Sequence, residues 1–288
     1  TSTMTATAIG NVFNAYTGTA AAVTATGMDA NQIAAVVAGA SKITAGGITG
    51  TVSLTAAQSH TLVTALNSSA TVTVSDTGAA INSGLANIVT DIAKIDTIDA
   101  SDSTAIVLTV AQAKAITNAK LTLGDTVNLT DTAANITGSD GLAAAAFANI
   151  DTVTVSDTGA AINTAIPTIT TNAASIDKID ASDSTVLALT LAQLTSITNT
   201  KLTADDTVKV TLAANDTLAS ATNIDQVNIG VSAITGSAQA TLSAVDATGE
   251  WFFNGSGTLS WWNGSVVDHV TLTGVTSIAS VAAGVFTL

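Results

Sequence analysis

The sequence is poor in the residues on which most functional sites depend. Its 288 residues include no cysteine, no arginine, one proline, one glutamate and two histidines. The absence of cysteine excludes disulfides and thiol chemistry. Only seven lysines face 21 acidic residues, which gives a net charge of −14. We therefore expect no nucleic-acid partner, because phosphate recognition depends on Lys and Arg.

Long apolar stretches are missing as well. No run of about 18 apolar residues lacks a polar interruption, so we expect no membrane-spanning helix. The N-terminal segment TSTMTATAIGNVFNAY lacks a basic stretch followed by an apolar one, so we expect no ordinary signal peptide on this chain. Many Thr and Ser residues and few charges are typical of a secreted surface, and we expect an extracellular location.

The most informative feature that is present is repetition. The segment TVTVSDTGAAIN at residues 71–82 returns letter for letter at residues 152–163. From residue 71 to residue 127, 37 of 57 positions match the residue 81 places later, without a gap. Shorter β-type runs that end in Asp or Thr recur within each copy. Repeat periods of about 20–50 residues indicate a solenoid, in which each unit buries its apolar face against its neighbours.

Each repeat has the pattern of a strand followed by a helix. The motif LTxAQ occurs three times, and its Thr is the predicted helix N-cap: Thr55, Thr109 and Thr190. The apolar spacing from Ile81 to Ile95 follows one face of an amphipathic helix. In the second copy Pro167 predicts a late helix start, near residues 163–166. Strand–helix–strand units of this length bring strands together in parallel.

The predicted fold is therefore an α/β repeat solenoid of about seven strand–helix coils with a parallel sheet. We expect a helical N-terminal cap at residues 1–50, solenoid repeats at 51–248 and a β-hairpin cap at 249–288. Two Asn-Gly turns, at Asn254 and Asn263, indicate the hairpins. The main alternative is an all-β parallel helix.

Aspartates mark the ends of the predicted strands. They are Asp76, Asp99, Asp131, Asp157 and Asp180, with Asp96, Asp102, Asp177 and Asp183 beside them. Stacked coils would place equivalent carboxylates about 4.8 Å apart, where like charges repel. One interpretation is that each Asp caps the following helix or turn. The other is a ladder of oxygen ligands for Ca²⁺. Both can hold together.

Catalytic chemistry has little support in the sequence. His60 and His269 are far apart, and neither lies in a metal-ligand or triad spacing. We therefore expect no enzyme. The three tryptophans, Trp251, Trp261 and Trp262, form either the apolar core of the C-terminal cap or an exposed platform that stacks on sugars.

The repeats VTVSDTGAAI and LTxAQ, with the C-terminal GTLSWWNG and GVFTL, resemble the large β-strand-repeat proteins that bacteria secrete by the type I route. Those include S-layer and RTX-adhesin-like polypeptides. The resemblance implies a surface structural role and an uncleaved C-terminal export signal, although the chain lacks the GGxGxD nonapeptide. Our first hypothesis is a non-enzymatic extracellular structural protein that assembles with copies of itself into a filament, S-layer or matrix. The alternative is an adhesin or glycan-binding module of the cell surface.

Overall fold

The structure is a computed structural model that describes residues 5–18, 21–235 and 238–288. Residues 1–4 and 19–20 of the expected N-terminal cap lie outside the described residues. The chain divides into two compact units, one of Thr1–Thr130 with Ala143–Asp151 and one of Asp131–Leu142 with Thr152–Leu288. The three predicted parts, residues 1–50, 51–248 and 249–288, stay a prediction.

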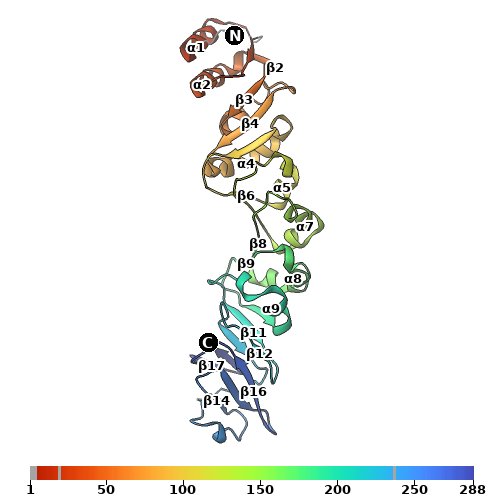
Figure 1. Cartoon of the computed structure of the whole chain (residues 1–288), viewed down its shortest axis with the longest axis vertical. Helices are drawn as coiled ribbons and strands as arrows, with labels where there is room; N and C mark the ends of the chain where they lie inside the picture. Colours follow the sequence, from red (N-terminus) through yellow and green to blue (C-terminus); the bar gives the residue numbers. More distant parts are fainter. Residues whose placement is uncertain (1–4, 19–20, 236–237) are drawn as a thin grey trace. The chain divides into compact units, whose positions relative to one another are not determined.

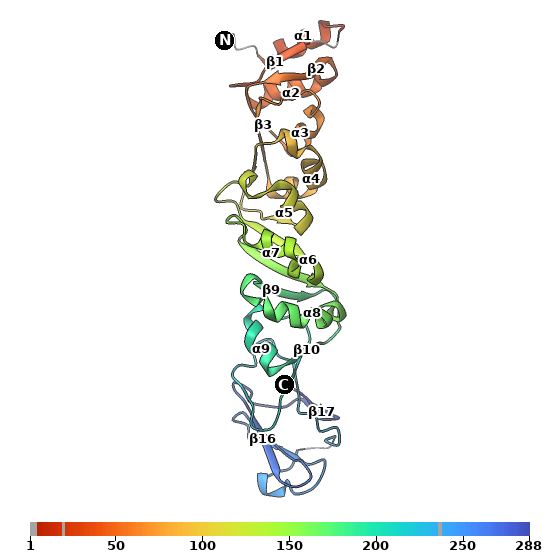
Figure 2. The same cartoon turned by 90° about the vertical axis from the view of Figure 1, so that its right-hand side faces the viewer.

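Helices and parallel strands alternate in the first unit (Figure 1). The helices are α1 (Ala6–Ala15), α2 (Ala30–Ala38), α3 (Ala56–Leu62), α4 (Gly78–Asp91) and α5 (Val110–Ile116). The strands are β1 (Ala21–Thr24), β2 (Ile43–Thr49), β3 (Thr51–Leu54), β4 (Thr71–Asp76), β5 (Thr97–Ala100), β6 (Ile106–Leu108) and β7 (Val127–Asp131). The pairs β1–β2, β3–β4, β4–β5 and β6–β7 are all parallel. Figure 2 shows α3 and α4 following one another beside the strands.

The second unit continues the pattern and then changes to antiparallel strands. Its helices are α6 (Ala133–Thr137), α8 (Gly159–Thr171) and α9 (Leu191–Ile197), and α7 (Ser139–Ala145) lies at the division between the units. Its first strands are β8 (Thr152–Asp157), β9 (Lys178–Ala181), β10 (Leu187–Thr190), β11 (Val208–Thr211), β12 (Thr217–Leu218) and β13 (Gln226–Asn228). The C-terminal strands are β14 (Trp251–Phe253), β15 (Thr258–Trp262), β16 (Val267–Leu272), β17 (Ser280–Ala282) and β18 (Val285–Thr287). The pairs β8–β9, β10–β11 and β11–β13 are parallel, whereas β14–β15, β15–β16 and β17–β18 are antiparallel.

The fold is thus mixed α/β, with several parallel sheets and a small antiparallel sheet, as the sequence predicts in these terms. The all-β alternative is wrong, because the first part of the Ile81–Ile95 spacing lies in α4, where Ile81, Leu85 and Ile88 are buried. The last two residues of the spacing, Ile92 and Ile95, lie in and just after a 3₁₀ turn. In β4 every second residue points inward, and Val72 and Val74 are fully buried. No helix among the described residues is long and apolar enough to cross a membrane.

The predicted Thr N-caps are confirmed. The hydroxyls of Thr55, Thr109 and Thr190 each accept a hydrogen bond from the backbone N–H of the Gln three residues later. That Gln side chain in turn accepts from the backbone N–H of the Thr, so the motif LTxAQ is a complete capping box. Both the Thr and the Gln of the motif therefore have a structural role.

The predicted late start of the second long helix is wrong. The helix α8 begins at Gly159, capped by Thr158, just as α4 begins at Gly78 after Thr77. The identical residues at both starts supply the same cap, and this local signal outweighs the proline. Pro167 therefore lies inside α8, at an exposed position, where its missing N–H costs one helical hydrogen bond.

The capping box gives a first testable prediction. Replacing Thr109 with Ala removes the acceptor for the Gln112 N–H and should lower the free energy of unfolding by about 1 kcal/mol. Thr109→Ser keeps the hydroxyl and should lose much less. Urea unfolding followed by circular dichroism measures both, and equal losses for Ala and Ser would contradict a capping role.

Candidate metal centre and the carboxylates between coils

An Ile-Asp pair joins one repeat to the next at four places within the described residues. The Oδ2 atoms of Asp96, Asp151, Asp177 and Asp225 each accept a hydrogen bond of 2.8 Å from the N–H of a valine in the preceding coil. The backbone N–H of each Asp donates to the carbonyl of that same valine, at 2.8–3.0 Å. The aspartate and the valine thus exchange two hydrogen bonds. We call this arrangement the Asp–Val clamp.

A second set of carboxylates reaches the start of the helix in the preceding layer. Asp76 accepts from the N–H of Ala56, the first residue of α3, and Asp157 accepts from that of Ala133, the first residue of α6, both at 3.1 Å. The first N–H groups of a helix lack partners within the helix, so a carboxylate placed there accepts a hydrogen bond from one of them. Its negative charge also interacts favourably with the positive end of the helix dipole. The prediction that each Asp caps the following helix or turn holds in part. Thr residues are the helix N-caps, whereas Asp102 and Asp183 accept from the N–H of Thr104 and Thr185 in the turn that follows each of them.

Asp102 and Asp183 hold the starts of the long helices. Asp102 Oδ1 accepts from the N–H of Gly78 at 2.9 Å, and Asp183 Oδ1 accepts from that of Gly159 at 3.0 Å. These backbone hydrogen bonds lower the pKa of both carboxyls below the usual Asp value. The glycine is required at this point, since a Cβ on Gly78 would lie 2.0 Å from the carbonyl oxygen of Thr104.

The predicted ladder of equivalent carboxylates is wrong where the strands pair. Asp76 lies opposite Ala100, and Asp99 lies opposite Ser75. The second copy repeats this offset, since Asp157 faces Ala181. Neighbouring residues of a strand point to opposite faces, so an offset of one residue separates the two acids. Ser75 and Ser156 instead donate to Asp99 and Asp180, and Asp131 accepts from the Thr132 N–H and the Asn135 amide.

One group of three carboxylates does converge among the described residues. Ligand oxygens of Asp180, Asp205 and Asp206 all lie within 4.8 Å of one another. Asp206 is buried, Asp180 is half-buried and Asp205 is exposed. Carboxylate oxygens are the ligands of hard cations, so this triad could hold a metal ion. The other eight predicted metal ligands are not part of the group.

Burial dominates the electrostatics of the triad. It raises the pKa of Asp206, against the effect of hydrogen bonds from the Thr203 hydroxyl and the Ala181 N–H. The charges of Asp180 and Asp205 raise it further. A group with a raised pKa in the folded state contributes stability at low pH that is lost as the pH rises through that pKa. Ionisation of Asp206 therefore lowers the stability of the folded state.

The first repeat has no such triad. The equivalent positions in the first copy are Asp99, Gly124 and Asp125, so one carboxylate is missing. Burial likewise raises the pKa of Asp125. Sequence reasoning missed Asp205 and Asp206. The signal that could have found them is the doubled Asp shortly before a strand, one coil after Asp180.

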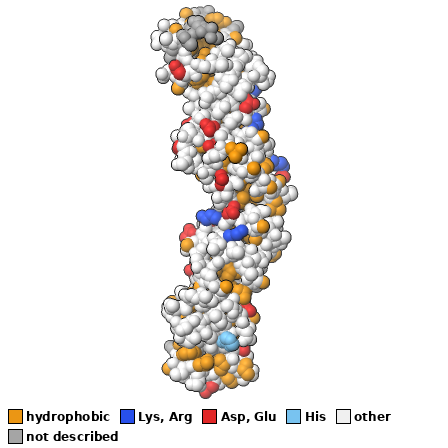
Figure 3. All heavy atoms as spheres, in the orientation of Figure 1, with side chains coloured by type: hydrophobic (Ala, Val, Ile, Leu, Met, Phe, Trp, Pro, Cys, Tyr) orange, Lys and Arg blue, Asp and Glu red, His pale blue; other side chains and the backbone are white. Residues whose placement is uncertain are grey.

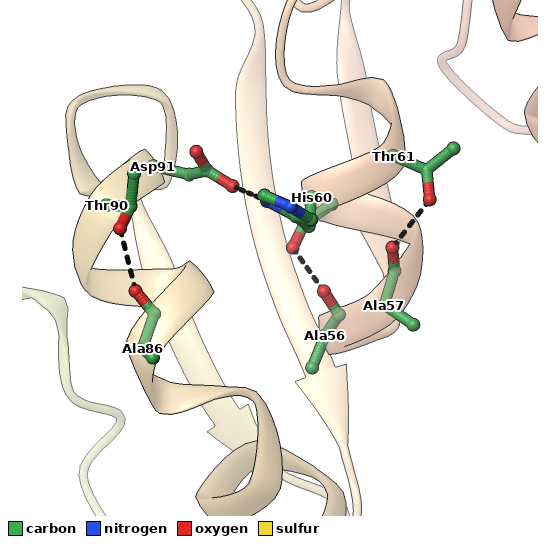
Figure 4. A network of polar contacts seen from close by, with 8 residues as sticks. Ala56, Ala57, His60, Thr61, Ala86, Thr90 and Asp91 are labelled. Carbon is green, nitrogen blue, oxygen red and sulfur yellow. Dashed lines mark hydrogen bonds and ion pairs between the residues drawn. The ribbon is translucent and has the colours of Figure 1, made fainter.

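His60 pairs with an aspartate of the adjacent helix (Figure 4). Its Nδ1 lies 2.7 Å from Oδ2 of Asp91, whose side chain is only 7% exposed. The nearby hydroxyls of Thr61 and Thr90 donate to the helix carbonyls of Ala57 and Ala86. No described hydroxyl is bonded to the His60 ring, so the pair joins α3 to α4 without the third member of a catalytic triad.

Lysines close the opposite ends of the helical segments. The ammonium groups of Lys42, Lys94, Lys120 and Lys201 donate to backbone carbonyls of the preceding layer, for example from Lys94 to Leu66 at 3.0 Å. Each of these lysines is the last residue of a short 3₁₀ turn. Four of the seven lysines therefore serve as hydrogen-bond donors between adjacent layers. The face in Figure 3 shows only scattered acidic and basic groups.

The predicted platform of three tryptophans is wrong for two of them. Trp251 and Trp261 are 6% and 2% exposed. The Trp251 ring meets the ring of Phe286 edge to face, with 5.1 Å between centroids. Trp251 and Trp261 are thus buried on β14 and β15, with Phe286 contributed by β18 of the neighbouring sheet. Of the three tryptophans, only Trp262 is partly exposed. Both Asn-Gly turns lie between paired antiparallel strands, as predicted.

Comparison with protein families, with curated proteins and with solved structures finds no match to this chain. The geometry of its own residues therefore carries the functional argument.

The Asp–Val clamp gives a second prediction. Asp177→Ala removes the acceptor for the Val153 N–H in a partly buried position, and should lower the free energy of unfolding by about 1–3 kcal/mol. Asp177→Asn keeps an Oδ1 acceptor and should lose a smaller amount. Urea unfolding of both variants measures the difference. Losses that are equal for Ala and Asn would mean that the hydrogen bond contributes nothing.

Proposed function

We propose that this chain is a non-enzymatic structural protein of the cell exterior, which assembles with copies of itself into a filament, S-layer or matrix. The observation that carries the proposal is the use of polar side chains between layers. Asp, Asn, Lys and Ser side chains repeatedly bond the backbone or the side chains of the adjacent repeat. Such side chains hold a scaffold together and are not left to act on a substrate.

We further propose that the repeats form one α/β solenoid. The Asp–Val clamp recurs in both units, and the helix-start contacts of Asp76 and Asp157 recur at equivalent positions of the two copies. Repeats with the same joint add stability layer by layer. The resemblance to secreted repeat proteins supports an extracellular setting, with which a chain without cysteine is compatible.

A glycan-binding or adhesin role is the second proposal. The observation in its favour is an apolar surface on the C-terminal sheet, where partly exposed Trp262 pairs with Val267 and adjoins Val266, which is 54% exposed. Figure 3 shows hydrophobic side chains gathered over these strands. An exposed aromatic ring can stack on a sugar ring, and such patches commonly mark binding surfaces.

Calcium is the cation that we propose for the triad of Asp180, Asp205 and Asp206. Three carboxylates and few competing positive charges suit a hard divalent ion with oxygen ligands. Binding would offset the repulsion between the three acids and so stabilise the second unit.

Imaging tests the assembly. Purified protein examined by negative-stain electron microscopy over a range of concentrations should form regular polymers or sheets. A monodisperse protein at every concentration, combined with selective binding on a glycan array that is lost in Trp262→Ala, would reject self-assembly and support the adhesin role.

Thermal melting tests the calcium site. At low ionic strength, Ca²⁺ should raise the melting temperature of the natural sequence after EGTA treatment, and Asp206→Asn should abolish the shift. Without Ca²⁺, Asp206→Asn should leave the melting temperature at pH 7 unchanged or raise it. The reason is that burial raises the pKa of the Asp206 carboxyl, so its ionised form destabilises the folded state. The matched control is Asp125→Asn in the first repeat, which should keep the Ca²⁺ shift. An unchanged midpoint in the natural sequence leaves the acids with their hydrogen-bonding role alone.

A further inference from the structure

The helices of successive coils differ in what covers them. Helix α4 packs on α3, with Gly84 so close that an added Cβ would lie 3.0 Å from the Cβ of Ala56. In the second unit α8 packs on α6 in the same way. In both cases the strand before the covering helix ends in an Asp that bonds the first N–H of the covered helix.

The arrangement stops after α9. The next strand, β11, ends in Thr211 where β4 and β8 end in Asp. The chain then runs through Leu212 and Asp216 into β12 and forms no helix there. Helix α9 packs on α8, on β10 and on β11, and no helix of the described second unit lies on its other side.

A shallow, open groove lies beside α9, between this helix and the segment after β11. It has a volume of about 640 Å³ and an apolar lining, and it is formed by Thr190, Leu191, Ala192 and Thr195 of α9 with Thr211, Leu212, Ala213 and Asp216. The first residue of the motif helix is buried in the earlier copies, at 5% exposure for Ala56 and 7% for Val110. The equivalent Leu191, with the longest side chain of the three, stays partly exposed.

The two covered helices show what the groove is shaped to receive. The helix α4 is rich in Ala, Gly and Asn, approaches α3 closely at Gly84, and carries no charge before Asp91. The groove itself holds one charged side chain, that of Asp216. An uncharged helix with small residues and an apolar side chain therefore fits it.

Helix α1 has these properties. None of its ten residues is charged. Its Ile9 and Phe13 are buried in the cluster that contains Ile33 and Val36 of α2, whereas Val12 is 53% exposed. We propose that α1 of a second copy docks in the α9 groove, with Val12 against Leu191. This inference rests on the proposed self-assembly and names the surfaces that carry it.

The contact is head to tail, since two different surfaces meet. A heterologous contact that does not close into a ring produces an open polymer. The assembly should therefore depend on protein concentration. The same contact explains how a chain with little charge can associate without an ionic partner.

Single-cysteine variants test the contact, because the natural chain has no cysteine. Val12→Cys protein is mixed with Leu191→Cys protein that carries a longer affinity tag, and the mixture is treated with a short bis-maleimide cross-linker under assembling conditions. The expected product is a mixed dimer of intermediate mass. The matched control replaces Val12→Cys by Val107→Cys, an exposed valine of β6 that should give no mixed dimer.

A charge substitution supplies the second measurement. Leu191→Lys should raise the concentration needed for assembly at least tenfold, and Val107→Lys should leave it unchanged, with the melting temperatures of both variants showing that they fold. Polymers that form without the Val12–Leu191 cross-link, and that tolerate Leu191→Lys, would overturn this contact while the structural function stands. Absence of polymers and of the cross-link in every mixture would overturn both.

Discussion

The structure depends on how the backbone N–H groups at the start of each strand and helix find acceptors. Buried backbone donors that lack a partner are costly, and a coil that turns at each layer leaves several of them without an internal partner. Carboxylates from the next layer supply the missing acceptors at Val72 and Gly78, and again at Val153 and Gly159. The layers are therefore coupled by side chains as well as by the ladder of the sheet.

This constraint explains the composition. An acceptor that must reach the adjacent layer does so best when it is short, since each added rotatable bond costs conformational entropy when it is fixed. Asp satisfies this requirement and Glu does so less well, which agrees with the excess of Asp, 20 against one Glu. Backbone carbonyls, by contrast, need donors. Long Lys side chains such as Lys94 and Lys201 donate to carbonyls of the preceding layer.

Sequence reasoning reached the features that depend on local signals. The Thr caps, the amphipathic α4 and the Asn-Gly hairpins each follow from a few adjacent residues, and the structure has them. It failed where the outcome depends on which residues lie opposite one another. The one-residue offset between Asp76 and Asp99, the convergence of Asp205 and Asp206 on Asp180, and the burial of Trp251 all arise from pairing and packing between segments. The predicted late start of α8 failed for a different reason, because the N-terminal cap that α8 shares with α4 outweighed Pro167.

The strand–helix pattern ends at β11, where the Asp that accepts from the first N–H of the preceding helix in the earlier copies is replaced by Thr211. Replacing the strand-end Asp by Thr211 removes the acceptor that the first N–H of the preceding helix would use, and the following segment no longer builds a covering helix. The chain instead continues into β12 and β13, which still pair in parallel with β16 and β11, and then into antiparallel strands that bury Trp261 on β15 and Phe286 on β18. The loss of the strand-end Asp thus coincides with the end of the strand–helix pattern. Because this end leaves α9 with one uncovered side, the end of the repeats is also the point at which the fold presents apolar surface that its earlier layers bury.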